Sequence, residues 1–62
     1  MKFYVYYGGN EYDGLGIIAE NKIQALKILQ IPIPTCQLSD LHEFDNQEAY
    51  EASSLYSTIC RN

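Results

Sequence analysis

The chain has 62 residues, 47% of them hydrophobic, and a formal net charge of −4 at pH 7. A chain this short holds one small core, so we expect a single domain over residues 1–62, and the apolar content excludes a disordered chain. No apolar run approaches the roughly 20 residues of a membrane-spanning helix, and Phe3 to Tyr7 is too short for the core of a signal peptide. We therefore expect a cytoplasmic globular protein that does not bind membranes.

The first predicted element is a strand over residues 2–7. After Lys2, every position in this run is a strong β-former. Because side chains alternate along a strand, one face carries Phe3, Val5 and Tyr7, and the other carries Lys2, Tyr4 and Tyr6. We expect Phe3 and Val5 to face the core, which leaves Tyr4 and Tyr6 facing outward.

A turn and a second strand follow. Residues 8–14 contain three glycines together with Asn10 and Asp13, a composition that is typical of turns. Leu15, Ile17 and Ala19 then alternate on one face of the second strand. We expect an antiparallel hairpin whose loop is longer than a tight turn, with Tyr12 displayed at or near its tip.

A helix is predicted from Lys22 to about Gln30. Asn21 has the side chain of an N-cap, and Gln24 follows at the spacing of a capping box. The apolar stripe of this helix is wide enough to cover one sheet face, and Pro32 prevents its continuation. The expected common core of the hairpin and the helix consists of Phe3, Val5, Leu15, Ile17, Leu26 and Leu29.

The segment after the helix contains two prolines at alternate positions. We expect Ile31 to Pro34 to be extended, because each proline fixes its own φ and restricts the residue before it. Such a segment either carries the chain back across the sheet, which we favour, or is bound by a proline-recognising partner. Residues 37–44 then fit a third strand or a helical turn. We favour the strand, because a two-stranded hairpin with one helix is rarely stable alone.

A short C-terminal helix is the last predicted element. Asp45 and Glu48 have capping-box spacing, and apolar side chains recur at helical intervals at Ala49, Ala52, Tyr56 and Ile59. The Ser and Thr residues from Ser53 onward compete for backbone hydrogen bonds, which leaves open whether the helix stops there and the last residues run extended. Together the elements predict an α+β domain of a hairpin, a helix, a third strand and a short C-terminal helix.

The first half of the chain resembles a kind of small phage-encoded accessory protein. The similarity lies in Tyr4-Val5, in Glu11-Tyr12-Asp13-Gly14, and in the runs Ile17 to Asn21 and Ala25 to Leu29, where a hairpin leads into a helix opened by an Ala-Glu segment. It covers about half of the chain and departs in the proline segment and the tail. The resemblance implies an inhibitor of host or defence complexes, of which anti-CRISPR proteins are the best-known group. That group shares a mode of action and no motif, so it assigns no inhibitory residue.

No residue pattern of a catalytic, cofactor or metal site is present. Cys36, His42 and Cys60 lack the paired short spacings of zinc sites, and we expect both cysteines to be reduced. His42 has no recognisable nucleophile motif beside it. The glycines lack the phosphate-binding fingerprints, and turn geometry explains them. We therefore expect a protein that is not an enzyme and that uses no cofactor.

Negative charge is concentrated in the second half of the chain. Residues 37–51 contain no Lys or Arg and five carboxylates, those of Asp40, Glu43, Asp45, Glu48 and Glu51. Direct nucleic-acid binding needs the opposite sign of charge, whereas carboxylates suit a protein partner with a basic surface. The alternative interpretation is a solvated face that only keeps the chain soluble.

Tyrosine is the residue type that points most to binding. The chain has six tyrosines and no Trp, and tyrosine is enriched at protein interfaces. We therefore predict a partner-binding surface of Tyr4, Tyr6 and Tyr12 together with the five carboxylates. The predicted role is inhibition or modulation of a larger, basic, nucleic-acid-handling complex. The alternative is a structural domain that associates with copies of itself.

Overall fold

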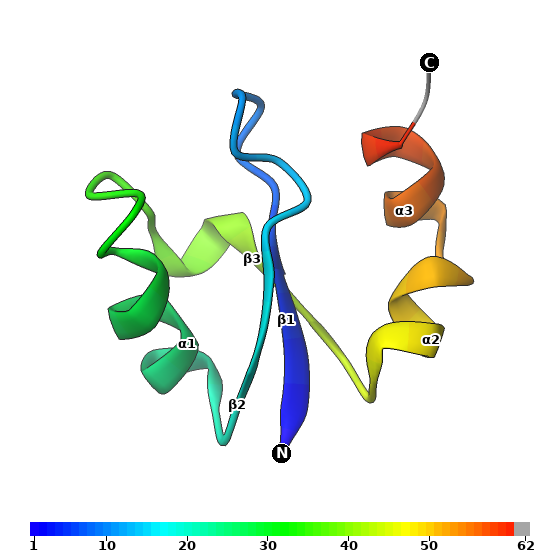
Figure 1. Cartoon of the computed structure of the whole chain (residues 1–62), viewed down its shortest axis with the longest axis horizontal. Helices are drawn as coiled ribbons and strands as arrows, with labels where there is room; N and C mark the ends of the chain where they lie inside the picture. Colours follow the sequence, from blue (N-terminus) through cyan, green and yellow to red (C-terminus); the bar gives the residue numbers. More distant parts are fainter. Residues whose placement is uncertain (61–62) are drawn as a thin grey trace.

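The structure, a computed structural model, describes residues 1–60 as a three-stranded sheet with helices on both of its sides (Figure 1). The strands are β1 (Lys2–Tyr6), β2 (Gly16–Ala19) and β3 (Leu41–Phe44). The α-helices are α1 (Lys22–Leu29), α2 (Gln47–Glu51) and α3 (Ser54–Ile59), and a single 3-10 turn, η1 (Leu38–Asp40), precedes β3. The predicted α+β class is therefore confirmed.

The sheet has the order β2-β1-β3, and β1 pairs antiparallel with both of its neighbours. The predicted hairpin and third strand are both present. The chain passes from β2 to β3 through α1, so this helix crosses the sheet over β1 and covers one face. In Figure 1 the sheet is seen nearly edge-on, with α1 on one side and α2 and α3 on the other. The molecule thus has three layers.

The register of the hairpin decides which side chains lie under α1. Tyr4 pairs with Ile17, and Lys2 pairs with Ala19. Directly paired residues of neighbouring strands share a face, so Tyr4 and Tyr6 lie on the same side as Ile17 and Ala19. The expectation that Tyr4 and Tyr6 face outward is wrong: they are 1% and 2% exposed beneath α1.

The core under α1 differs accordingly from the expected one. Leu29 is buried there, and Leu26 and Ile17 are partly buried against it, as expected. Leu15 is 38% exposed, and Phe3 and Val5 belong to the opposite face. The buried residues of this core are Tyr4, Tyr6, Ala19, Ala25, Leu29, Ile33, Cys36 and Leu41.

A second, aromatic core lies on the face that α2 covers. Tyr50 of α2 packs its ring 5.7 Å from that of Phe3 and 5.3 Å from that of Phe44, measured between ring centroids. Tyr56 of α3 stands at 88° to Tyr50 with a centroid distance of 5.2 Å. Offset and edge-to-face geometries of this kind are the favourable ones for aromatic pairs. Val5 is fully buried. Each face of the sheet therefore packs against helices and forms a core.

The start of α1 matches its predicted cap. The Asn21 side chain accepts a hydrogen bond from the backbone N–H of Gln24 at 2.8 Å. The Gln24 side chain reaches back to the backbone N–H of Glu20, one residue before the N-cap, at 2.6 Å. The helix is thus fixed at its N-terminus by side chains on both sides of the first turn.

We had expected the proline segment to be extended, and this expectation is wrong. It forms a series of turns, in which Ile33 N–H donates to Leu29 C=O and Cys36 N–H donates to Ile33 C=O, each at 2.9 Å. These turns place Ile33 and Cys36 in the core, where both are 2% exposed. Burial of Ile33, between the prolines, and of Cys36, after them, therefore outweighs the preference of the prolines for an extended backbone. The segment 37–44 combines both alternatives, a helical turn followed by the strand.

The C-terminal region contains two short helices where one was expected. The N-cap of α2 is Asn46, whose side chain accepts from Ala49 N–H at 2.8 Å, so the predicted Asp45–Glu48 capping box is wrong. Helix α2 ends at Glu51 with Ala52 as its C-cap, and Ser53 is the N-cap of α3, since its hydroxyl accepts from Tyr56 N–H. The first helix thus stops just before Ser53, which the sequence had left open, and the residues after it are helical rather than extended.

Truncation of Leu29 should test the core under α1. Leu29 is 1% exposed, so Leu29→Ala should lower the free energy of unfolding by about 2–5 kcal/mol through lost burial and the remaining cavity. In a domain of this size such a loss is a large part of the total stability. Ile31→Ala is the matched control, because Ile31 is 82% exposed and its truncation should leave urea denaturation almost unchanged. Equal effects of the two changes would contradict this core.

Candidate functional site

Four of the five predicted carboxylates already have partners within the fold, among them Glu51, which accepts a hydrogen bond from the Gln47 side chain. Asp40 accepts from the backbone N–H of Gln37 in the turn η1. The Tyr4 hydroxyl donates to Glu43 at 3.0 Å, and Lys2 forms an ion pair with Asp45 at 2.6 Å. These contacts do not bury the carboxylates deeply, since Glu43 and Asp45 remain exposed. Part of their negative charge is nevertheless balanced by hydrogen bonds and an ion pair within the protein.

The five carboxylates do not share one face. Glu43 pairs with Tyr4 and therefore lies on the α1 side of the sheet. Glu48 and Glu51 belong to α2, on the other side, and both are exposed. Because β3 is an edge strand, the carboxylates follow that edge and continue along α2. The surface is an acidic border rather than a flat patch, and we call these five residues the acidic border.

The three lysines of the chain all lie outside the α2–α3 layer. Lys22 and Lys27 both lie on α1. Residues 46–60, which form α2 and α3, contain acidic residues and no Lys or Arg. Since α1 and the pair α2–α3 lie on opposite sides of the sheet (Figure 1), the α2–α3 layer has an uncompensated negative charge.

The three tyrosines of the predicted surface are not brought together. Tyr4 and Tyr6 are core residues, so a partner cannot contact their rings without unfolding the region around α1. Only Tyr12 is exposed, at 42%, on the loop between β1 and β2. A partner-binding role of Tyr12 stays a prediction.

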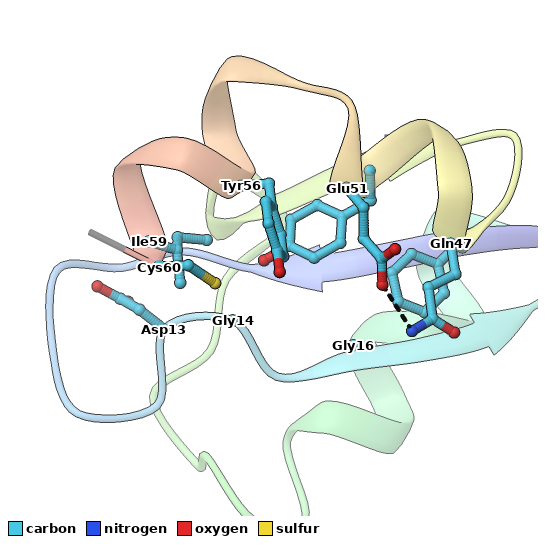
Figure 2. A pocket seen from close by; sticks show the side chains of 10 residues that line it. Asp13, Gly14, Gly16, Gln47, Glu51, Tyr56, Ile59 and Cys60 are labelled. Atoms are coloured by element: carbon cyan, nitrogen blue, oxygen red, sulfur yellow. Dashed lines mark hydrogen bonds between the residues drawn. The ribbon is translucent and has the colours of Figure 1, made fainter. Parts of the chain in front are cut away.

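A groove lies between the hairpin and the α2–α3 layer. Its volume is about 560 Å³, and it is lined by Phe3, Asp13, Gly14, Gly16, Gln47, Tyr50, Glu51, Tyr56, Ile59 and Cys60. Figure 2 shows Asp13, Ile59 and Cys60 at one end, Gln47 at the other, and Tyr56 and Glu51 between them. Glu51 accepts a hydrogen bond from the Gln47 side chain at 3.1 Å.

The hairpin side of the groove is shaped by two glycines. A Cβ atom at Gly16 would lie 2.5 Å from the Phe3 ring, so the absent side chain lets this ring lie directly over the strand. Gly14 has φ +95°, and a Cβ there would lie 2.9 Å from the Ile59 side chain. The backbone at both positions therefore approaches its neighbours in a way that only glycine permits.

The loop at the end of the groove is closed by its own carboxylate. Asp13 Oδ1 accepts from the backbone N–H groups of Gly8 and Gly9 at 2.9 Å and of Asn10 at 3.3 Å. Successive N–H groups of a turn commonly bind anions in this way. Here the anion is supplied by the chain, and the loop is held in one shape.

The phenols in the groove resist ionisation. Burial raises the pKa of Tyr50, and the neighbouring Cys60, Tyr56 and Glu51 raise it further. The pKa of Tyr56 is raised chiefly by Cys60 and also by Glu51. Ionisation of either phenol would place a second negative charge beside one already present, and the two charges would repel each other. The carboxylates of Asp13 and Glu51, which line the groove, also disfavour an anion there.

The cysteines and His42 do not form a reactive centre. Cys36 is buried and Cys60 is exposed, and no disulfide joins them. Burial, together with Asp40, raises the pKa of the Cys36 thiol, which makes it less reactive at neutral pH. The Tyr7 and His42 rings lie 6.3 Å apart on the α2 side of the sheet. Within residues 1–60, no three side chains of His, Cys, Asp or Glu gather closely enough to hold a metal ion.

Comparison with known proteins gives no match: no protein-family model, no curated protein and no solved structure is similar to the chain. In the part of the chain that the structure describes, none of the helices is long and apolar enough to cross a membrane.

The ion pair between Lys2 and Asp45 should make stability depend on pH at both ends of the scale. By hydrogen bonding and attraction, Lys2 lowers the pKa of Asp45 below 3.8, and Asp45 raises the pKa of Lys2 above 10.5. The carboxylate stabilises the fold above its unfolded pKa, and this effect is lost as the pH falls through the lower folded pKa. The ammonium stabilises the fold below its unfolded pKa, and this effect is lost as the pH rises through the raised one.

The comparison of wild type with Asp45→Asn measures this effect. We expect a constant difference in melting temperature from about pH 5 to about pH 9, which disappears in strong acid. High salt should reduce it, because both side chains are partly exposed. Glu11→Gln is the control, since no hydrogen bond or ion pair of the Glu11 side chain occurs within residues 1–60. A difference that persists below both pKa values would contradict the assignment.

Proposed function

We propose that this protein is a non-catalytic binding module that inhibits or modulates a larger complex with a basic, nucleic-acid-handling surface. Its partner is a protein, and the place of action is the cytoplasm. The inhibitory, phage-type role rests on the resemblance of the first half of the chain to small phage-encoded accessory proteins. The basic nature of the partner rests on the charge of this chain.

The observation that carries the proposal is the uncompensated negative charge of the α2–α3 layer. The α2–α3 layer has Glu48 and Glu51 and no Lys or Arg, whereas Glu43 of the edge strand β3 lies on the α1 side of the sheet. A surface with charge of one sign attracts a partner of the opposite sign over distances of roughly 8 Å at physiological salt. A surface that normally binds nucleic acid is basic and would be attracted in this way.

A second candidate function, self-association, is favoured by the edge of β2. This strand reads Gly-Ile-Ile-Ala, has no charged residue or proline, and lies at the sheet edge. Ile18 is 66% exposed. Edge strands usually carry charges, prolines or bulges that prevent pairing with another chain, and β2 lacks the first two. The opposite edge, β3, carries Glu43 and is followed by Asp45, so two acidic copies would repel each other there.

Capture of partners from a bacterial lysate at increasing salt tests the main proposal. Glu43→Gln with Glu48→Gln should reduce the amount of basic protein retained, because two charges of the acidic border are lost. Glu11→Gln with Glu20→Gln removes the same number of charges elsewhere and should have little effect. With the captured partner purified, the first double variant should associate at least about twofold more slowly at low salt, with a weaker salt dependence. Unchanged rates and salt response would show that the acidic border serves only solubility.

Sedimentation velocity over a range of concentrations tests self-association. If β2 pairs with β2 of a second copy, wild type should form a dimer at high concentration, and Ile18→Lys should abolish it by placing like charges in the interface. Ile23→Lys adds the same charge on α1, at a residue that is 52% exposed, and should leave the dimer intact. A wild type that remains monomeric throughout removes this second candidate.

A further inference from the structure

The groove between the hairpin and α2–α3 has the size and the aromatic walls of a ligand site. Its volume of about 560 Å³ is within the range of roughly 300–1,000 Å³ that is common for such sites. The Phe3 ring covers Gly16 on the strand side, and Tyr50 and Tyr56 stand edge to face on the helical side. Three aromatic rings therefore surround the space from two different layers.

The Tyr50 hydroxyl is the polar end of a mostly buried residue that lines this groove. Tyr50 is 6% exposed, and none of the hydrogen bonds within residues 1–60 involves its hydroxyl. The hydroxyl lies near the hairpin backbone, 3.9 Å from where a Cβ of Gly14 would be. A phenol in this position is able to accept a hydrogen bond from a ligand.

The charge of the lining selects the sign of that ligand. Glu51 extends into the groove from α2, and Asp13 lies at the far end (Figure 2). Among residues 1–60, those that line the groove include no Lys, Arg or His. Asp13 already accepts three backbone hydrogen bonds, so Glu51 is the carboxylate that is free to pair with an incoming cation, with only Gln47 bound to it.

We propose that this groove binds an arginine side chain presented by a basic protein partner. The guanidinium group would lie against the Tyr50 and Tyr56 rings, donate to the Glu51 carboxylate and donate to the Tyr50 hydroxyl. This site specifies how the protein would contact the partner proposed above. It rests on that proposed function only in taking the arginine to come from a basic protein.

The chemistry of the groove favours arginine over lysine. A guanidinium is planar, stacks on aromatic rings and offers several N–H donors in fixed directions, so it is able to serve a carboxylate and a phenol together. An ammonium is a more strongly hydrated point charge and gains less from flat aromatic walls. The Glu51 carboxylate contributes to the raised pKa of both tyrosines, although burial is the main cause for Tyr50 and Cys60 for Tyr56.

Titration with N-acetyl-arginine amide, followed by NMR in reducing buffer, tests the site without any protein partner. We expect saturable, millimolar binding with shift changes at Gly14, Gly16 and Glu51, and contacts between the probe and the Tyr50 and Tyr56 rings. The matched probe, N-acetyl-citrulline amide, has nearly the same shape without the charge and should bind at least about tenfold more weakly. N-acetyl-lysine amide should fall between the two.

Three variants distinguish arginine binding in the groove from general attraction to the negative charge of the protein. Glu51→Gln should weaken arginine binding by about tenfold, and Tyr50→Phe, which retains the ring, by about fivefold. Glu48→Gln removes an equal charge from the same helix outside the groove and should change the affinity less than about twofold. Because Arg61 follows the groove residue Cys60 in the sequence, each titration is repeated in Arg61→Ala, where the chain's own guanidinium cannot compete.

Equal shift changes at the other four residues of the acidic border, equal binding of citrulline, or stronger binding of lysine would each overturn the arginine site. So would the absence of saturable binding in both wild type and Arg61→Ala. These outcomes are distinguishable from failure of the proposed function, because that function is tested by Glu43 and Glu48, which lie outside the groove. An arginine probe that binds as expected, with no basic partner captured, would support the site and reject the larger function.

Discussion

The register of the β1–β2 hairpin is the constraint on which the other features depend. Because Tyr4 pairs with Ile17, the even-numbered side chains of β1 lie under α1 and the odd-numbered ones face α2. The two large phenols thereby become the centre of the first core, and their polar ends reach its margins. Tyr4 donates to Glu43 on β3, and the Tyr6 hydroxyl accepts from Asn10 in the hairpin loop. A shift of one residue would exchange the faces and bring both tyrosines under α2.

The elements of the fold could be predicted from local sequence signals, but their faces could not. Asn21 caps its helix through its own side chain, and the turn residues after Tyr7 are visible without any tertiary information. The faces of β1 were harder to assign, because aromatic side chains occupy both of them and the one charged residue, Lys2, shares its face with the buried Tyr4 and Tyr6. The register between β1 and β2 depends on how the loop between them folds. The hydrogen bonds of Asp13 and Gly14 fix the conformation of this loop.

The candidate site was predictable only in its charge. Five carboxylates without a basic residue between them can be seen in the sequence, although their partners Lys2 and Tyr4 come from the distant β1. The groove joins Phe3, the glycines of the hairpin and the last two helices, and no local pattern connects these segments. Tyr50 and Tyr56 were visible as tyrosines on a helical pattern. Their edge-to-face arrangement depends on the break at Ser53, which turns α3 relative to α2 and lets both rings face the hairpin.

The position of β1 in the middle of the sheet has a consequence for how this chain folds. Phe3 pairs with Phe44, and Tyr6 pairs with Leu41, so one side of the central strand stays unpaired until the chain has been synthesised past β3. Such contacts between distant residues require a large loop to close first, which slows folding compared with a helical protein of equal length. Until then a nascent chain exposes a strand of aromatic and β-branched residues with a bare edge. The interval between synthesis of the first and the third strand is therefore the period in which this protein is most prone to aggregate.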